Sequence, residues 1–160
     1  MRDELAMLGN GAHALAIQIL GNRDDAADAV HDAFARVLAR SQAWDRKHGP
    51  LRPWFLRIVR NRCIDLLRRR RPAGGLVEEL AATGPGPDAV LEALQRDRRL
   101  ERALADLTPE QREIIVLRDY LDLAYAEIAA VLDVAPGTVM SRLHRARLAL
   151  RKRMEQENDQ

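Results

Sequence analysis

The sequence predicts an all-α protein with two small helical domains joined by a flexible linker. Its 160 residues are 47% hydrophobic, which is enough to build real cores, but only 4% are aromatic. Alanine, leucine and arginine recur throughout, and this composition favours helices over sandwiches and barrels. Apolar residues recur at helical spacing on both sides of a stretch rich in glycine and proline. We therefore expect domains over residues 1–71 and 96–154, and a linker over residues 72–95.

The N-terminal domain is predicted to contain three helices. Helical periodicity runs over residues 5–20 and again over residues 24–39, with a Gly-Asn pair between them. A polar stretch over residues 41–53 follows, and apolar positions from Phe55 onward indicate a third helix. That helix ends in a run of four arginines, because Pro72 directly after the run cannot continue it.

The predicted linker and the start of the second domain are marked by composition. Residues 72–87 are rich in glycine and proline and cannot bury enough apolar surface to order themselves. A helix is expected over residues 88–107. Next, Thr108 can cap a helix, Pro109 suits its first turn and Gln111 completes a capping box. The helix that begins there carries apolar residues at Ile114, Ile115, Leu117 and Leu121.

Residues 125–147 have the spacing of a helix-turn-helix, with helices expected over residues 125–132 and 136–153. Four apolar positions of the second helix are expected to face inward: Val139, Leu143, Ala146 and Leu150. The remaining side chains would face outward: Thr138, Met140, Ser141, Arg142, His144, Arg145 and Arg147. Hydroxyl, guanidinium and imidazole groups near a helix N-terminus suit the DNA major groove. The alternative is an ordinary helical hairpin with a solvated basic face.

The charges of the chain are segregated although the net charge is only +2. Basic residues crowd into residues 57–71 and 142–153, and acidic residues gather over residues 24–32. Two basic clusters indicate two contacts with a polyanion. A single cysteine, Cys63, excludes an intrachain disulfide, and the four histidines are too scattered for a zinc-finger spacing. We expect no metal and no cofactor.

No apolar run approaches the roughly 20 residues that span a bilayer. The N-terminus also carries Arg2, Asp3 and Glu4 before any hydrophobic stretch, unlike a signal peptide. We therefore expect a cytoplasmic protein without membrane insertion.

Four segments, in this order and spacing, resemble those of bacterial extracytoplasmic-function (ECF) sigma factors. They are DAADAVHDAF at residues 25–34, WFLRIVRNRCID with its arginine run at 54–71, LTPEQR at 107–112 and GTVMSRLHRAR at 137–147. The resemblance covers nearly the whole chain. It implies a promoter-melting N-terminal domain and a C-terminal domain that recognises the minus-thirty-five element. It also implies two partners, promoter DNA and core RNA polymerase, the latter bound through its β′ coiled coil and its β flap. An anti-sigma factor is implied as a further partner. The resemblance implies no catalytic chemistry.

Two groups of residues take on roles through this resemblance. Asp25, Asp28 and Asp32 lie at i, i+3 and i+7 on one helix face, which is implied to dock on the polymerase. Alternatively, Asp24, Asp25 and Asp28 only complement the helix dipole. Asn61 and the 41–53 stretch are implied to capture a base extruded from the minus-ten element. The other residues implied in minus-ten binding are Trp54, Arg57, Arg60, Arg62 and Arg68. Core packing of Trp54 and a merely solvent-facing Asn61 are the alternatives.

Two other classes of protein compete with a sigma factor. A free-standing repressor or activator would explain the helix-turn-helix but gives no role to Asn61 and Trp54. A helical metal phosphohydrolase would use His31 and Asp32 with His13 or Asp28, but no second well-spaced ligand pair is visible in the sequence.

Overall fold

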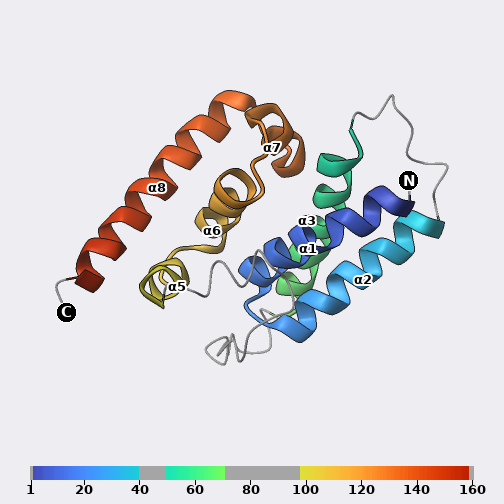
Figure 1. The fold of residues 1–160 in the computed structure, drawn as a ribbon, viewed down its shortest axis with the longest axis horizontal. Helices are drawn as coiled ribbons and strands as arrows, with labels where there is room; N and C mark the ends of the chain where they lie inside the picture. Colours follow the sequence, from blue (N-terminus) through green and yellow to red (C-terminus); the bar gives the residue numbers. More distant parts are fainter. Residues whose placement is uncertain (1, 40–49, 71–97, 159–160) are drawn as a thin grey trace. The chain divides into compact units, whose positions relative to one another are not determined.

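The computed structural model describes residues 2–39, 50–70 and 98–158, and in this part of the chain the regular structure is entirely helical (Figure 1). The elements are α1 (Arg2–Leu20), α2 (Arg23–Ala39), α3 (Leu51–Arg70), α5 (Arg98–Ala105), α6 (Pro109–Ile115), η3 (Val116–Tyr120), α7 (Tyr125–Leu132) and α8 (Pro136–Asn158). The chain divides into two compact units, Met1–Gly84 and Pro85–Gln160. The all-α prediction is confirmed. The predicted linker lies outside the described residues.

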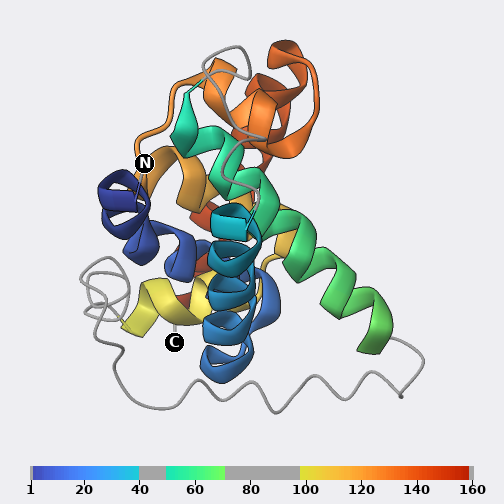
Figure 2. The same ribbon diagram turned by 90° about the vertical axis from the view of Figure 1, so that its right-hand side faces the viewer.

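In the N-terminal unit α1, α2 and α3 each pack against the other two, as Figures 1 and 2 show from two directions. Their apolar faces meet in a core that includes the fully buried Leu15, Phe55 and Val59. The ring of Phe34 on α2 lies against the ring of Phe55 on α3, with centroids 4.8 Å apart. This core holds α2 and α3 next to each other, so that polar side chains of the two helices meet where the helices pack together.

The helix boundaries in this unit follow local chemistry. Gly21 adopts a positive φ of 73° at the end of α1, and the side-chain oxygen of Asn22 accepts a hydrogen bond from the Asp25 N–H at 3.0 Å. The helix α3 begins at Leu51, earlier than predicted, because Pro53 fits the first turn of a helix, where its missing N–H has no partner to lose. Residues 51–53 of the predicted polar stretch therefore belong to α3, and its residues 41–49 lie outside the described part.

In the C-terminal unit α5, α6 and α7 pack along α8. The predicted capping box is confirmed: the Thr108 hydroxyl accepts from the Gln111 N–H at 3.2 Å, and the Thr108 N–H donates to the Gln111 side chain at 3.1 Å. Arg112 donates to the Leu104 carbonyl at 3.4 Å and to the Leu107 carbonyl. Burial lowers the pKa of Arg112. The LTPEQR segment thus joins α5 to α6 by side-chain hydrogen bonds to the backbone.

The structure differs from the sequence prediction after α6, where residues Val116–Tyr120 form a π-helix instead of continuing the α-helix. The Leu121 N–H donates to the Val116 carbonyl five residues earlier, at 2.9 Å. Asp122 follows with a positive φ of 56° and ends the helix. Hydrophobic spacing does not reveal such a wide turn, because the apolar residues on either side of it remain buried.

The helix-turn-helix has the predicted form. The first helix, α7, has the expected bounds, and Asp133 turns the chain in the left-handed conformation at φ 59°. The second helix, α8, extends five residues beyond the predicted end. The inward positions Val139, Leu143 and Ala146 are buried, as expected, and Leu150 is half-buried.

The N-terminus of α7 offers a stability prediction. Ala124 is the N-cap and has no side chain to accept a hydrogen bond, while Glu127 accepts from the Ala124 N–H at 2.9 Å. Ala124→Ser would complete the capping box and should stabilise this unit by about 1 kcal/mol. Thermal unfolding followed by circular dichroism should show a rise of about 4–8 °C in the transition of the C-terminal unit. Ala130→Ser is the control, because Ala130 is exposed inside the same helix; an equal rise there would contradict the capping explanation.

Candidate nucleic-acid interface

The first turns of α8 carry the outward face predicted for DNA contact. Six of the seven residues expected there are exposed, and Thr138 is half-buried: the exposed ones are Met140, Ser141, Arg142, His144, Arg145 and Arg147. The Ser141 hydroxyl donates to the Thr138 carbonyl at 3.1 Å, which holds it against the helix. Met140 is 58% exposed, an unusually open position for a large apolar side chain. The face therefore combines cationic, hydroxyl and apolar groups.

Arg147 differs from the other residues of this face because it is paired with an acidic side chain of another element. Its Nε donates to Asp119 at 3.2 Å, and its Nη2 donates to the other oxygen of the same carboxylate. The hydrogen bond to Asp119 raises the pKa of Arg147. The guanidinium therefore faces η3. Helical periodicity placed Arg147 on the outer face but carried no information about this acidic neighbour.

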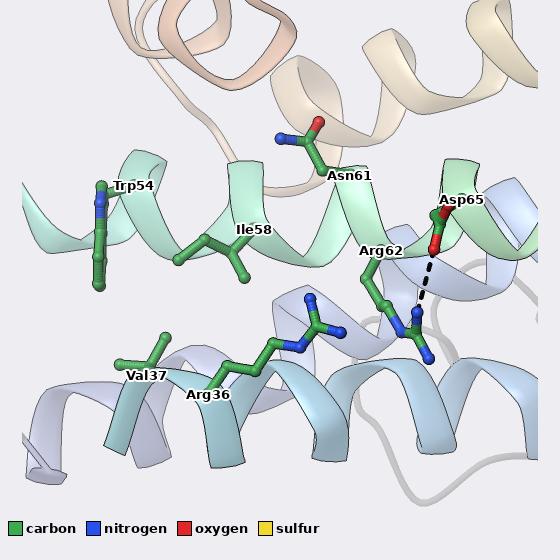
Figure 3. Close-up of a pocket in the computed structure, with 7 residues that line it drawn as sticks. All are labelled: Arg36, Val37, Trp54, Ile58, Asn61, Arg62 and Asp65. Carbon is green, nitrogen blue, oxygen red and sulfur yellow. Dashed lines mark hydrogen bonds and ion pairs between the residues drawn. The ribbon is translucent and has the colours of Figure 1, made fainter. Parts of the chain in front are cut away.

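In the N-terminal unit a cavity of about 430 Å³ lies between α2 and α3 (Figure 3). Its lining includes Trp54, Asn61 and Arg62 of the residues expected to contact the minus-ten element, together with Arg36, Val37, Ile58 and Asp65. Figure 3 shows Ile58 and Arg62 directed toward α2 and the Asn61 amide directed away from it. Trp54 is half-buried and Asn61 is exposed. Asn61 thus borders the cavity, and its accessible amide points outward, away from α2.

The other expected minus-ten residues lie elsewhere on α3. Arg57 and Arg68 are exposed, and Arg60 is half-buried; none of these three lines the cavity. The segment over residues 41–49, which was expected to cooperate with Asn61, lies outside the described residues. The structure thus brings together Trp54, Asn61 and Arg62 at one cavity and distributes the remaining arginines along the helix.

A chain of ion pairs borders this cavity. Arg62 is placed between Asp32 on α2, at 2.8 Å, and Asp65 on its own helix, at 3.1 Å. The Arg62 Nε and the Asp32 Oδ2 are shielded from solvent. Arg36 reaches Asp32 at 3.4 Å, and Arg69 reaches Asp65 at 3.3 Å. The network links α2 to α3 along their polar edges.

These pairs involve two of the three acids that were expected to dock on the polymerase. Asp32 contacts Arg62, Asp25 contacts Arg70, and Asp28 is exposed. Periodicity correctly placed these carboxylates away from the apolar face of α2 but missed that the basic helix α3 packs beside them. The complementary charge of the two segments was the available signal.

The other predicted features can be checked in the described residues alone. Over residues 2–39, 50–70 and 98–158, no three histidine, cysteine or acidic side chains are grouped so that they could hold a metal ion. Within the same ranges, none of the helices combines the length and hydrophobicity required to cross a membrane. His31 is exposed, and Asp32 is engaged by arginines.

Comparison with known proteins assigns a family to each unit. Residues 6–73 match the family model of Sigma-70 region 2, and residues 97–150 match that of Sigma-70, region 4. The ECF RNA polymerase sigma factor SigW of Bacillus subtilis is 30% identical over 156 residues, which cover 89% of this chain and 82% of SigW. This chain belongs to the ECF RNA polymerase sigma factors.

Other similar proteins support the assignment of this chain to the ECF sigma factors. SigE of Mycolicibacterium smegmatis, also an ECF RNA polymerase sigma factor, is 36% identical over 87% of this chain; the chain spans 55% of the length of SigE. The fold matches that of the sigma factor RpoE from Bartonella quintana, solved in complex with the anti-sigma factor NepR, with a TM-score of 0.73 and 24% identity over 96% of both chains. CnrH, solved with the cytosolic domain of CnrY, matches with a TM-score of 0.64 and 27% identity over 97% of this chain and 90% of CnrH.

Family membership decides between the classes of protein weighed from the sequence. The sigma factor binds RNA polymerase and recognises promoters, so it acts in transcription initiation. A free-standing repressor or activator is excluded by the match of the N-terminal unit to Sigma-70 region 2. The resemblance inferred from the four sequence segments is confirmed.

Proposed function

We propose that this sigma factor directs bacterial core RNA polymerase to promoters and opens the DNA strands there, leaving catalysis to the polymerase in the cytoplasm. The observation that carries the strand-opening role is the accessible Asn61 amide, which points outward from α3 beside the cavity between α2 and α3. The proposed domains are residues 1–71 for polymerase docking and the minus-ten element, and residues 96–154 for the minus-thirty-five element, with residues 72–95 as the linker between them.

Strand opening requires a pocket that compensates for the loss of base stacking. Extruding a base costs a few kcal/mol, which hydrogen bonds and stacking in a pocket must recover. Asn61 offers both a donor and an acceptor to a base edge, and Trp54 lines the same cavity. The volume of about 430 Å³ falls within the range of small-molecule sites. We assign phosphate contacts to Arg57, Arg60 and Arg68, and we assign Arg62, which is held by Asp32 and Asp65, to positioning α3.

Recognition of the duplex is assigned to α8. An exposed helix face with cationic and hydroxyl side chains near its N-terminus suits the major groove, where arginine pairs with guanine. We propose that the contacting residues are Thr138, Met140, Ser141, Arg142, His144 and Arg145.

We assign docking on the polymerase to both units. The exposed acidic edge of α2 would bind the β′ coiled coil of the polymerase, and the C-terminal unit would bind its β flap. Asp28 is the exposed member of the acidic set, so we expect it to contribute most of the attraction to the β′ coiled coil, with Asp25 and Asp32 also tied to α3. An anti-sigma factor is proposed as a regulator, supported by the complexes in which RpoE and CnrH were solved.

The decisive experiment is transcription reconstituted from the purified chain and core RNA polymerase on fragmented genomic DNA of the source organism, with start sites mapped. We expect a small set of defined start points that share two upstream elements. The proposal fails if the chain directs no initiation at any defined position, even if it binds DNA.

Arg145 supplies a prediction for the duplex-reading face. Arg145→Ala should reduce discrimination at one or two positions of the minus-thirty-five element by about 1–3 kcal/mol, the value of a bidentate contact to a base. Transcription from a promoter library randomised at this element measures the loss. Arg68→Ala is the control and should weaken all promoters alike, because phosphate contacts carry no sequence information. An unchanged preference at every position in Arg145→Ala would contradict base reading by this side chain.

A further inference from the structure

The pairing of Arg147 with Asp119 separates this arginine from its neighbours on α8. The two residues lie 28 positions apart in the sequence and come from α8 and η3. The contact is a two-pronged fork, with Nε and Nη2 of the guanidinium donating to the two oxygens of one carboxylate. Such forks restrain both position and orientation more strongly than a single contact. Arg147 thereby has a fixed direction, toward η3.

Asp119 lies in an irregular part of the backbone. Asp119 belongs to the π-helical turn, a rare conformation that is frequent at functional sites. The preceding side chain of η3, Arg118, donates to the Leu123 carbonyl at 2.8 Å and lies 5.1 Å from the centre of the Tyr125 ring. Tyr125 also interacts with Arg147, so it contacts both arginines, whereas the Asp119 carboxylate pairs with Arg147. Asp119 is 35% exposed, so its carboxylate remains close to the surface that carries the DNA-reading side chains.

We propose that Asp119 is a positioning residue that withdraws Arg147 from the DNA backbone and anchors α8, so that α8 contacts DNA through its other exposed side chains. This proposal rests on the proposed binding of α8 to the major groove. A free arginine beside the duplex would add a phosphate contact, which raises affinity for every sequence alike and thus carries no discrimination. The Asp119 carboxylate removes that contribution and favours binding that depends on bases.

The test measures salt dependence, which a purely structural role would leave unchanged. The full chain, assembled with core RNA polymerase, is bound to a labelled promoter duplex and to a duplex of unrelated sequence over a series of salt concentrations. For Arg147→Gln we expect the slope of log affinity against log salt to equal that of the unmodified protein. For Asp119→Asn the slope should steepen by about 0.9, the value of one additional phosphate contact. Affinity for the unrelated duplex should also rise, so that the ratio between the two duplexes falls.

Two further variants separate this effect from damage to the fold. The double variant Asp119→Asn/Arg147→Gln should return the slope to its original value, because the released arginine is no longer present. Asp119→Glu, which keeps a carboxylate, should retain the original slope. Circular dichroism monitors folding of each variant; if Asp119→Asn does not fold, Arg147→Gln alone still decides the question. A slope shallower by about 0.9 in Arg147→Gln would overturn the proposal, because Arg147 would then contact phosphate in the unmodified protein. Failure of the unmodified holoenzyme to prefer any promoter would instead overturn the proposed function.

Discussion

Replacing Asn61 with alanine is expected to lower open-complex formation by about 100-fold, because the alanine cannot hydrogen-bond to an extruded base. Extrusion costs a few kcal/mol, and a loss of about 2–3 kcal/mol in its recovery corresponds to this factor. Asn61 is exposed, so the substitution should leave the core of the N-terminal unit intact. Permanganate reactivity of unpaired thymines on a linear promoter, together with transcript yield, measures the effect.

Two comparisons make this prediction specific for strand opening. Asn10→Ala removes the same side chain from an exposed position on α1 and should be neutral. A promoter that is already mismatched over the minus-ten element should restore most of the activity of Asn61→Ala, because its bases need not be unpaired. Equal transcription by Asn61→Ala and the unmodified protein on the linear promoter would refute the assigned role.

Replacing Asp32 with alanine is expected to destabilise the N-terminal unit. The substitution leaves the guanidinium of Arg62, only 20% exposed, without its partner on α2. Breaking a fully buried ion pair lowers the free energy of unfolding by about 3–5 kcal/mol. Because the Asp32 side chain is 37% exposed, we expect a smaller loss here, of about 2–3 kcal/mol. Urea unfolding followed by tryptophan fluorescence measures it, because both tryptophans of the chain, Trp44 and Trp54, belong to this unit.

The matched variant Asp28→Ala removes an exposed carboxylate from the same helix. It should leave stability within about 0.5 kcal/mol of the unmodified protein, as is usual for surface substitutions, but should weaken binding to core RNA polymerase. The two acids would then be separated by role, with Asp32 joining α2 to α3 and Asp28 meeting the polymerase. The prediction is wrong if Asp32→Ala keeps full stability and loses affinity for the polymerase as strongly as Asp28→Ala. Asp32 would then act in docking, as the sequence suggested, and not in joining α2 to α3.

Much of the fold could be predicted because local signals coincide with the tertiary structure. The Thr108 capping box, the helix-turn-helix core around Val139 and Leu143, and the break at Gly21 all depend on neighbours within a few residues. The all-α class followed from composition and periodicity alone. Such features need no information about which segments meet in space.

The candidate site was predicted less completely because pairings between distant segments decide it. Helical spacing identified Asp32 and Arg147 as polar positions outside the apolar face, but not that each has a partner of opposite charge on another element. The turn at Val116–Tyr120 was also missed, because no residue type marks a π-helix. Asn61 was identified through the family resemblance alone, and the structure adds the cavity beside it.

A π-helical turn amounts to one surplus residue inserted into an ordinary helix. Deleting a single residue between Val116 and Tyr120 would restore regular winding, and the helix on the two sides of the turn would keep nearly the same phase, because the widened turn takes up the surplus residue locally. The carboxylate that meets Arg147 would then have to come from a turn that is one residue shorter. The contact between η3 and α8 is therefore tied to the length of the chain within a single turn, and a change of one residue there is expected to disturb it without touching α8 itself.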